Sequence, residues 1–409
     1  MKPKHPWFKA RHYKHFDVQV DVRFADGDAS NPAFVATHDW LPLIHYVKRE
    51  KRYKPKDGKT VYKDRDIMYA SHRDACILGR YAGILSNFLE KYYDSHELSE
   101  HVIAYRKTGK SNYAFSADAC RFSQLNAPCI VLCFDITGFF DHLDHSIIKD
   151  RLKRVLGLNE IPADWYKVFR YVTNFKKIAR ADLAADPIFG LRLKLITHSP
   201  IATIAEVKLA AVPIFVNPNK YGIPQGTPIS SAISNLYMID LDSNISKICK
   251  LKGALYQRYS DDILIVCRPE HESYITAEFL RMVGLHKLEI KAEKTERVEF
   301  DPAKPKAFQY LGFNISPDGA TIRHNSLGKQ WRRLKKGMRK ARRDGDLAIH
   351  EGRAVEIYTK KLRRKFSPVG IRNFSTYARN AAKAFGSKQI VKQVRRLERK
   401  ADEAIRQLK

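Results

Sequence analysis

The chain has 409 residues, of which 44% are hydrophobic and 11% are aromatic. This length and composition predict a globular protein with a sizeable core and several subdomains, and they exclude an intrinsically disordered chain. Lys and Arg number 74 against 44 Asp and Glu, which gives a net charge of +30. Such an excess predicts a polyanionic partner, with nucleic acid as the default and an anionic membrane surface as the alternative.

Three negative observations predict a cytoplasmic protein. No stretch is long and apolar enough to span a bilayer, so we expect no membrane partner. Residues 1–11 lack the apolar core of a signal peptide. The six cysteines show no zinc-type spacing, and several lie in apolar runs, where reduced core cysteines are expected.

The first third of the chain predicts helical structure followed by one buried strand. Residues 1–60 are basic and lack a clear period, which predicts an irregular extension. Apolar spacing over 66–98 predicts a helix, and residues 102–107 predict a strand that runs into a basic turn. The apolar run 129–136 has no polar alternation, which is typical of a strand buried on both faces, and Asp135 lies at its end.

The middle of the chain predicts alternating helices and strands. A loop rich in Gly and Pro over 222–228 opens a helix. Apolar β-formers flank Asp261 and Asp262 over 254–267, which predicts a strand, a tight turn and a second strand. The remaining expectations are helices over 144–156, 162–180, 230–248 and 270–283, strands over 191–196 and 212–216, and a strand and turn over 308–315.

The last 89 residues differ in character from the rest. Residues 321–409 hold 27 Lys and Arg against 7 Asp and Glu, a net charge of +20. Helical patterns over 327–345, 351–365 and 388–408 predict a basic, mostly α-helical C-terminal domain. One-sided charge of this size favours phosphate contacts over a merely solvated helix face.

Three aspartates suggest a metal site. Burying the adjacent pair Asp261 and Asp262 without compensation would be costly, and a divalent cation is the usual compensation, although an ordinary acidic turn is the alternative. Asp135 also ends a predicted strand. Together the three could form one acidic cluster at a sheet edge, which suits two Mg²⁺ ions and phosphoryl transfer on nucleic acids.

Five motifs in order give the chain a family resemblance. The ordered set resembles motifs A to E of reverse transcriptases, although each motif alone is weak evidence. The matching segments are Phe134-Asp135 with Phe139-Phe140-Asp141 (A), Gly222-Ile223-Pro224-Gln225-Gly226 running to Asn235-Leu236-Tyr237 (B), Tyr259-Ser260-Asp261-Asp262 (C), Lys294-Thr295 (D) and Tyr310-Leu311-Gly312 (E).

The resemblance implies an α/β (α+β) right-hand polymerase with an antiparallel palm sheet. The implied domains are a basic N-terminal extension (1–60), fingers (61–130 with part of 150–221), a palm with motifs A to E (131–315) and a basic α-helical thumb or RNA-binding C-terminal domain (316–409). The implied activity is RNA-directed DNA polymerisation by two-metal-ion nucleotidyl transfer.

The resemblance also implies roles for the acidic residues. Asp135, Asp261 and Asp262 would be the catalytic carboxylates and metal ligands, with the Ile136 carbonyl as an additional ligand. A structural carboxylate is the alternative for Asp262. The implied cofactor is Mg²⁺, two ions, with Mn²⁺ as a substitute. His142 and His145 follow motif A and are expected at an exposed helix start, with metal ligation as the alternative.

Further residues are implied to bind the incoming nucleotide. Phe140 would exclude a ribose 2′-OH, with a core phenylalanine as the alternative, and Gln225 and Gly226 would contact the nucleotide. The remaining implied residues are Arg106, Lys107 and Lys110 on the triphosphate (a plain surface turn being the alternative), Lys294 near the leaving pyrophosphate, and Tyr310, Leu311 and Gly312 as the primer grip.

The segments 69–75 and 102–107 resemble the bacterial defence-associated and abortive-infection reverse transcriptases. Retron and group II intron enzymes are more distantly similar. This resemblance implies a structured noncoding RNA template, dNTP substrates, a DNA product and antiphage defence, and it leaves a homo-oligomer open. The alternatives are a retron-like or group II intron-derived enzyme, or a non-catalytic RNA-binding or splicing factor with a polymerase fold.

Overall fold

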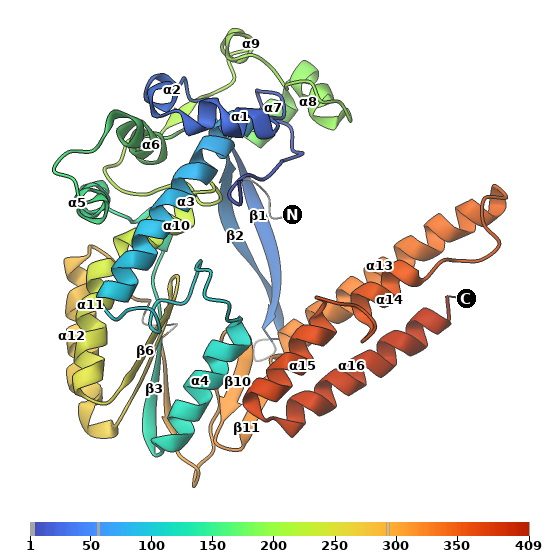
Figure 1. The fold of residues 1–409 in the computed structure, drawn as a ribbon. Coiled ribbons are helices and arrows are strands. Elements are labelled where there is room, and N and C mark those ends of the chain that lie inside the picture. The colour runs from blue at the N-terminus through green and yellow to red at the C-terminus, as the bar shows by residue number, and fades with distance from the viewer. Residues whose placement is uncertain (1–4, 55–57, 292, 294, 409) are drawn as a thin grey trace.

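A four-stranded antiparallel sheet in the order β6-β7-β3-β8 forms the centre of the protein (Figure 1). In this computed structural model, the described residues are 5–54, 58–291, 293 and 295–408. The strands are β3 (Cys129–Asp135), β6 (Leu255–Tyr259), β7 (Asp262–Cys267) and β8 (Glu296–Phe300). The predicted strand over 129–136 and the predicted acidic hairpin are therefore both confirmed.

Both faces of this central sheet are covered by helices. Ile130 and Leu132 of β3 join a core with α11 (Ile239–Leu251) and α12 (Glu272–Leu285), whereas Val131 faces α4 (Asn112–Leu125). Burial on both sides explains why the sequence of β3 has no polar alternation.

A second sheet has the order β2-β1-β4-β5. Strands β1 (Leu43–Lys54) and β2 (Lys59–Tyr69) form a long antiparallel arm, which extends toward the C-terminal helices (Figure 1). Short strands β4 (Lys176–Ala179) and β5 (Phe215–Val216) extend the sheet at the base of the arm. The helices around this base are α1 (Val22–Asp26), α2 (Pro32–Thr37), α3 (His72–Ser95), α5 (His145–Leu156), α6 (Ala163–Thr173), α7 (Arg180–Ala185), α8 (Pro187–Lys194) and α9 (Ile204–Leu209).

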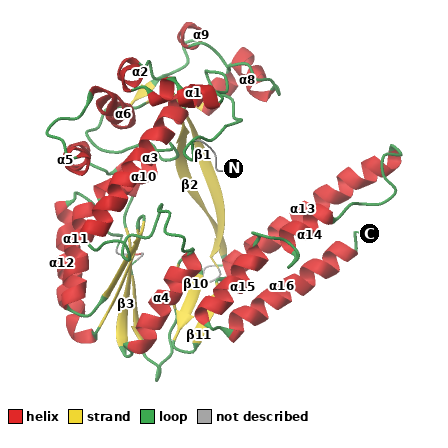
Figure 2. Cartoon of the chain, in the orientation of Figure 1, coloured by secondary structure: helices red, strands yellow, loops and turns green. Residues whose placement is uncertain are grey.

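A third sheet and four helices end the chain. The sheet has the order β11-β10-β9, from β9 (Phe308–Tyr310), β10 (Phe313–Ser316) and β11 (Gly319–Ile322). The helices are α13 (His324–His350), α14 (Lys360–Phe366), α15 (Phe374–Phe385) and α16 (Lys388–Arg406). They project from the rest of the protein (Figure 2), and α15 and α16 pack against α4 and β11 in a shared core. The prediction of a helical C-terminal region is confirmed, although α14 is shorter than expected and α15 was missed.

Several predicted boundaries in the first half were wrong. Residues 1–60 are not irregular, because they contain α1, α2 and β1. Residues 66–69 belong to β2, where they pair with 44–47 of β1, and α3 begins only at His72, after the capping side chain of Ser71. Pairing with a neighbouring strand thus overrides the helical pattern at this boundary.

Other corrections concern the middle of the chain. The helix predicted over 162–180 ends at Thr173, and 191–196 is largely the end of α8, which the Asp186 side chain caps. The strand predicted over 212–216 is limited to β5. The helix predicted over 230–248 is two helices, α10 (Ser230–Tyr237) and α11.

The described residues form no helix with the length and apolar character needed to cross a bilayer. All six cysteines are free thiols, and five of them are buried.

Candidate active site

The three predicted carboxylates lie at the end of two neighbouring strands. Asp135 is the direct cross-strand partner of Asp262 in the antiparallel register of β3 and β7. Asp261 occupies the turn between β6 and β7, and its carbonyl accepts a hydrogen bond from the Ile136 N–H at 3.3 Å. Residues 126 positions apart in the sequence are thereby brought to one edge of the sheet.

The turn that carries Asp261 adopts an unusual backbone conformation. Ser260 has φ of +62°, in the left-handed region, and its side chain is buried. Its Oγ accepts a hydrogen bond from the Tyr105 hydroxyl at 3.3 Å. A non-glycine residue keeps such a φ only when its surroundings determine it, so the structure fixes the direction in which this turn presents Asp261.

A buried ion pair supports the same turn from below. Arg258 of β6 and Asp242 of α11 are both fully buried, and the guanidinium donates from Nε and Nη2 to the carboxylate at 2.7 and 2.6 Å. Nη1 also donates to the Ser260 carbonyl and to Oδ1 of Asn235, each at 3.2 Å. Burial lowers the pKa of Arg258, but the adjacent Asp242 outweighs this effect, so its pKa is raised.

The segment 101–104 is joined to this network through the backbone. Arg258 donates from N to the His101 carbonyl at 2.8 Å, and Ile103 donates to the Arg258 carbonyl at 3.0 Å. Asn235, at the end of motif B, donates from Nδ2 to the Ala104 carbonyl at 3.0 Å. The predicted strand over 102–107 is reduced to a single bridge, Val102 to Arg258.

The Gly- and Pro-rich loop is held against motif A. Ile223 donates to the Phe140 carbonyl, and Gly222 donates to the Leu143 carbonyl, each at 2.9 Å. Gly222 has φ of +86°, and a Cβ there would lie 2.9 Å from the Asp141 carbonyl oxygen. Only glycine therefore allows this close approach. Phe140 is half-buried at the same junction, beside Phe139.

The other end of this loop touches the β1–β2 arm. Met68 of β2 donates to the Gln225 carbonyl at 2.8 Å. A Cβ on Gly226 would lie 2.7 Å from the Met68 carbonyl oxygen and 3.0 Å from Cγ2 of Ile67. Because side chains alternate along a strand, Arg65 shares the face of β2 that Ile67 turns toward Gly226.

Arg65 is a basic residue that the sequence analysis did not single out. Its Nη1 donates to Oε2 of Glu50 at 2.6 Å, and this bond is the main reason why the pKa of Glu50 falls to about 2. The signal in the sequence was the alternation of basic and acidic residues over 63–66, next to β-formers at Val61 and Tyr62.

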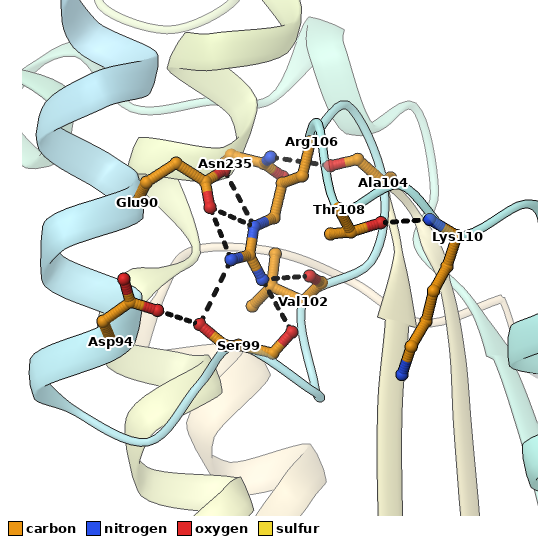
Figure 3. A network of polar contacts seen from close by, with 9 residues as sticks. All are labelled: Glu90, Asp94, Ser99, Val102, Ala104, Arg106, Thr108, Lys110 and Asn235. Carbon is orange, nitrogen blue, oxygen red and sulfur yellow. Dashed lines mark hydrogen bonds and ion pairs between the residues drawn. The ribbon is translucent and has the colours of Figure 1, made fainter.

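Arg106 lies inside a protein network and not at an open surface (Figure 3). Its guanidinium side chain is 4% exposed, donates to both carboxylate oxygens of Glu90 and to the carbonyls of Ser99 and Val102, and stacks on Tyr93. Because this side chain is buried, the plain surface turn that was the alternative for Arg106 is excluded. Lys107 is exposed, and Lys110 contacts Glu100 at 2.8 Å.

The predicted primer grip forms the turn between β9 and β10. Tyr310 is buried, and among the described residues its hydroxyl has no hydrogen-bond partner. Burial raises the pKa of this hydroxyl. Leu311 and Gly312 have φ of +42° and +97°, so both residues of the turn are left-handed. Lys294 lies outside the described residues.

The two histidines after motif A serve local structure. His145 begins α5 and pairs through Nε2 with the Gly222 carbonyl at 2.8 Å, which adds a further contact between motifs A and B. His142 contacts the Thr137 and Gly138 carbonyls through Nδ1. The expected exposed helix start is confirmed only in part: His145 begins α5 but is half-buried, whereas His142 is exposed but lies before the helix.

The donor set fits a hard divalent cation in its chemistry. Three carboxylates share one sheet edge, and the Ile136 carbonyl lies beside them. The backbone hydrogen bonds on either side of Ile136 use the Asp135 carbonyl and the Thr137 N–H. Oxygen ligands of this type are those that Mg²⁺ prefers. In the part of the chain that the structure describes, no three His, Cys, Asp or Glu side chains already converge as a metal cluster.

Comparison with solved structures shows the class of the fold. A telomerase from Candida albicans, in complex with a TWJ fragment of telomeric RNA, is similar at 13% identity with a TM-score of 0.52, over 92% of this chain and 56% of that one. Two structures of apo telomerase from Candida tropicalis each match at 11% identity. The form truncated from the C-terminal domain has a TM-score of 0.49 over 69% of this chain and 56% of that one, and the other has 0.47 over 98% and 67%.

The protein thus has a reverse-transcriptase-like polymerase fold of mixed α/β type. Residues 189–315 match the family described as reverse transcriptase (RNA-dependent DNA polymerase). The chain spans 56% of the length of the first two telomerases. No curated protein sequence matches it. Asp135 lies before the matched region, and the pairing of β3 with β7 places it opposite Asp262 of that region.

Proposed function

We propose that the protein is an RNA-directed DNA polymerase whose active site is the sheet edge formed by Asp135, Asp261 and Asp262. One observation carries the proposal: Asp135 pairs in register with Asp262 inside a sheet whose other strands belong to the reverse transcriptase domain. A cluster of carboxylates on adjacent strands is what nucleotidyl transfer requires of a protein scaffold.

Two divalent cations, Mg²⁺ or Mn²⁺, would be held by the three carboxylates and the Ile136 carbonyl, where they supply charge stabilisation for attacking and leaving oxygens. The chain itself positions these ligands. Arg258, Ser260 and Asp242 hold the turn that presents Asp261. Tyr310 and the turn after it would hold the primer end.

The incoming nucleotide would contact Phe140, Gln225 and Gly226. The loop that carries Gln225 is bonded to motif A on one side and to β2 on the other, so its backbone is fixed before a nucleotide arrives. The ring of Phe140 would exclude a ribose 2′-OH and thus select dNTPs.

For the triphosphate, exposure favours Arg65 and Lys107 over Arg106. Lys107 is exposed, and the Arg65 side chain, although paired with Glu50, is 28% exposed against 4% for Arg106. Arg106 is committed to Glu90 and to two backbone carbonyls, so we assign it the positioning of the segment 99–106. Arg65 shares the β2 face that meets Gly226, and its guanidinium suits a bidentate contact with phosphate.

The primary test is extension of a DNA primer on an RNA template by the purified chain, with dNTPs and Mg²⁺. We expect incorporation that requires both the cation and the template. A protein that binds RNA but extends nothing, in Mg²⁺ and in Mn²⁺, would instead support the non-catalytic RNA-binding alternative.

We further propose that the natural template is a structured noncoding RNA and that the DNA product acts in bacterial antiphage defence in the cytoplasm. The net charge of +20 over 321–409 supports RNA binding by shape and phosphate. Sequencing of the RNA and DNA that co-purify with the chain tests this. One enriched structured RNA and its complementary DNA are expected; a random transcriptome sample would contradict the proposal.

A further inference from the structure

A tyrosine outside the five motifs lies against the turn that presents Asp261. Tyr105 belongs to the segment between α3 and α4, and its hydroxyl donates to Oγ of Ser260 at 3.3 Å. Its ring lies 6.4 Å from that of Tyr259, at the end of β6. Tyr105 thus contacts the side chain that directly precedes Asp261 in the chain.

Both residues of this contact have an unusual backbone conformation. Tyr105 has φ of +61° and Ser260 has φ of +62°, so both lie in the left-handed region. This region is uncommon for residues other than glycine and is an outlier for a bulky side chain. Such a conformation persists only where the surroundings determine it. The contact therefore depends on what fixes the chain on either side of Tyr105.

The two neighbours of Tyr105 are fixed by different parts of the protein (Figure 3). Before it, the Ala104 carbonyl accepts a hydrogen bond from Nδ2 of Asn235 at 3.0 Å. After it, the Arg106 guanidinium donates to the Glu90 carboxylate and to two backbone carbonyls. Motif B thus holds one side of Tyr105 and helix α3 holds the other, which fixes the direction of the Tyr105 side chain.

The turn receives this contact at a buried position. Ser260 is buried, and in the described part of the chain the Tyr105 hydroxyl is the hydrogen-bond partner of its Oγ. Nη1 of Arg258 donates to the Ser260 carbonyl at 3.2 Å. Ser260 is therefore held through its side chain by Tyr105 and through its backbone by Arg258. Loss of the Tyr105 hydroxyl would leave a buried Oγ unpaired, which carries a free-energy cost.

The exposure of Tyr105 separates the role of its hydroxyl from that of its ring. Half of the residue is open to solvent, yet the hydroxyl is directed at the buried Ser260. Phenylalanine would serve equally well if the ring had only to pack against its neighbours. The hydroxyl is thus the group whose removal tests a specific role.

We propose that Tyr105 is a positioning residue for the catalytic turn: its hydroxyl holds the Ser260 side chain and thereby fixes the direction of Asp261 for nucleotidyl transfer. The proposal rests on the proposed polymerase function and deepens it. It also connects Arg106 to the chemical step, because Arg106 fixes the backbone that carries Tyr105. A disturbance anywhere along this path should lower kcat and leave dNTP binding intact.

The kinetic test is single-nucleotide incorporation by Tyr105→Phe, by Ser260→Ala and by the double variant. In each single variant kcat should fall about 3- to 10-fold, which is the worth of one hydrogen bond, while KM for the dNTP stays within about twofold. The double variant should be no slower than the slower single variant, because both changes remove the same bond. The matched control is Tyr274→Phe on α12, where Tyr274 is 51% exposed, and it should leave kcat unchanged.

A variant of Arg106 distinguishes positioning from direct phosphate binding. Arg106→Lys keeps the positive charge but cannot reproduce the bidentate contact with Glu90 together with the bonds to two carbonyls. Positioning predicts a lower kcat with KM for the dNTP within about twofold of the wild type. A rise in KM of about 10-fold or more at unchanged kcat would show that Arg106 binds the triphosphate and would overturn its place in this path.

A wild-type kcat in Tyr105→Phe, or losses that multiply in the double variant, would overturn the proposal. A wild type that synthesises no DNA would instead contradict the polymerase function, and thermal unfolding then tests the contact by itself. Tyr105→Phe should lower the unfolding midpoint of the wild type but leave that of Ser260→Ala unchanged. Equal shifts in both backgrounds would show that the hydroxyl does not act through Ser260.

Discussion

Asp242 accepts two hydrogen bonds from Arg258, and neither side chain is exposed to solvent. This pair joins α11 to β6 directly beneath the turn that carries Asp261. Burying two charges is costly, and the pair offsets that cost through its bidentate geometry together with the contacts to Tyr256, Asn235 and Ser260. We infer that the pair keeps the catalytic turn in one conformation.

Replacing Asp242→Asn should therefore weaken both stability and catalysis. The buried guanidinium loses its counter-charge, which costs about 3–5 kcal/mol of unfolding free energy. Where the variant folds, kcat should fall more than KM changes, because the turn and not the substrate contacts is disturbed. Denaturant unfolding and single-nucleotide incorporation measure the two effects. The double variant Arg258→Met/Asp242→Leu removes both charges and should recover part of the stability; a single variant as stable as wild type would contradict this account.

Gly222→Ala should disturb the contact between motifs A and B. The added Cβ would lie 2.9 Å from the Asp141 carbonyl oxygen at a φ of +86°, so we expect a loss of about 1–3 kcal/mol and reduced incorporation. Gly284→Ala is the matched control, because Gly284 lies in α12 with nothing within 4 Å of an added Cβ. The change in thermal unfolding midpoint relative to the wild type should differ between the two variants in sign or size. Equal effects would argue against a special backbone at Gly222.

Phe140→Ala should relax sugar selectivity. The half-buried ring lies at the junction of motifs A and B, and its removal opens space where a ribose 2′-OH would sit. The ratio of kcat/KM for dNTP over rNTP should fall by about 10-fold or more, since steric exclusion of this kind is worth about 1–3 kcal/mol. Unchanged selectivity with intact dNTP incorporation would assign Phe140 to the core alone.

The buried His15 should make the free energy of unfolding depend on pH. Burial lowers the pKa of His15 to about 4, against the opposing effects of Asp17 and the Tyr69 carbonyl, and His72 lowers it further. Between the unfolded value of about 6.5 and about 4, the unfolded chain binds more protons, so stability is present above pH 6.5 and falls as the pH drops.

This fall amounts to at most about 3 kcal/mol for His15 alone. His15→Gln retains a donor for the Tyr69 carbonyl but cannot titrate, so its urea midpoint should decline less than that of the wild type between pH 7 and pH 5. His72, His145 and His286, whose pKa values are also lowered, mainly by burial, remain in both proteins. Parallel declines for the two proteins would show that His15 is not the source.

The sequence predicted three of the four strands of the central sheet because these strands carry local signals, whereas β8 was missed. Two local patterns predict these strands without information about the strands that pair with them. They are the apolar run before Asp135 and the acidic hairpin around Asp261. Their pairing is a long-range property, and only the structure places Asp135 opposite Asp262. The strand β1 was missed because the arm is exposed beyond Leu43 and Ile44, so no apolar alternation marks it.

Arg106 illustrates a different reason for a missed prediction. A basic residue before a turn reads the same in sequence whether its guanidinium meets solvent, phosphate or a buried partner. Its actual partner, Glu90, lies 16 residues earlier on α3. The contact of Ile67 and Met68 with Gly226 likewise depends on how β2 meets motif B, which no local pattern encodes.

The central claim is tested most directly by primer extension on an RNA template with wild type, Asp135→Asn, Asp261→Asn and, as a matched control, Asp318→Asn, which replaces an exposed carboxylate in the β10–β11 turn. Each variant should fold and bind RNA as the wild type does. The account predicts that Mg²⁺-dependent DNA synthesis is retained in Asp318→Asn and lost in both Asp135→Asn and Asp261→Asn. Synthesis that persists in Asp135→Asn or Asp261→Asn at the wild-type rate would contradict it.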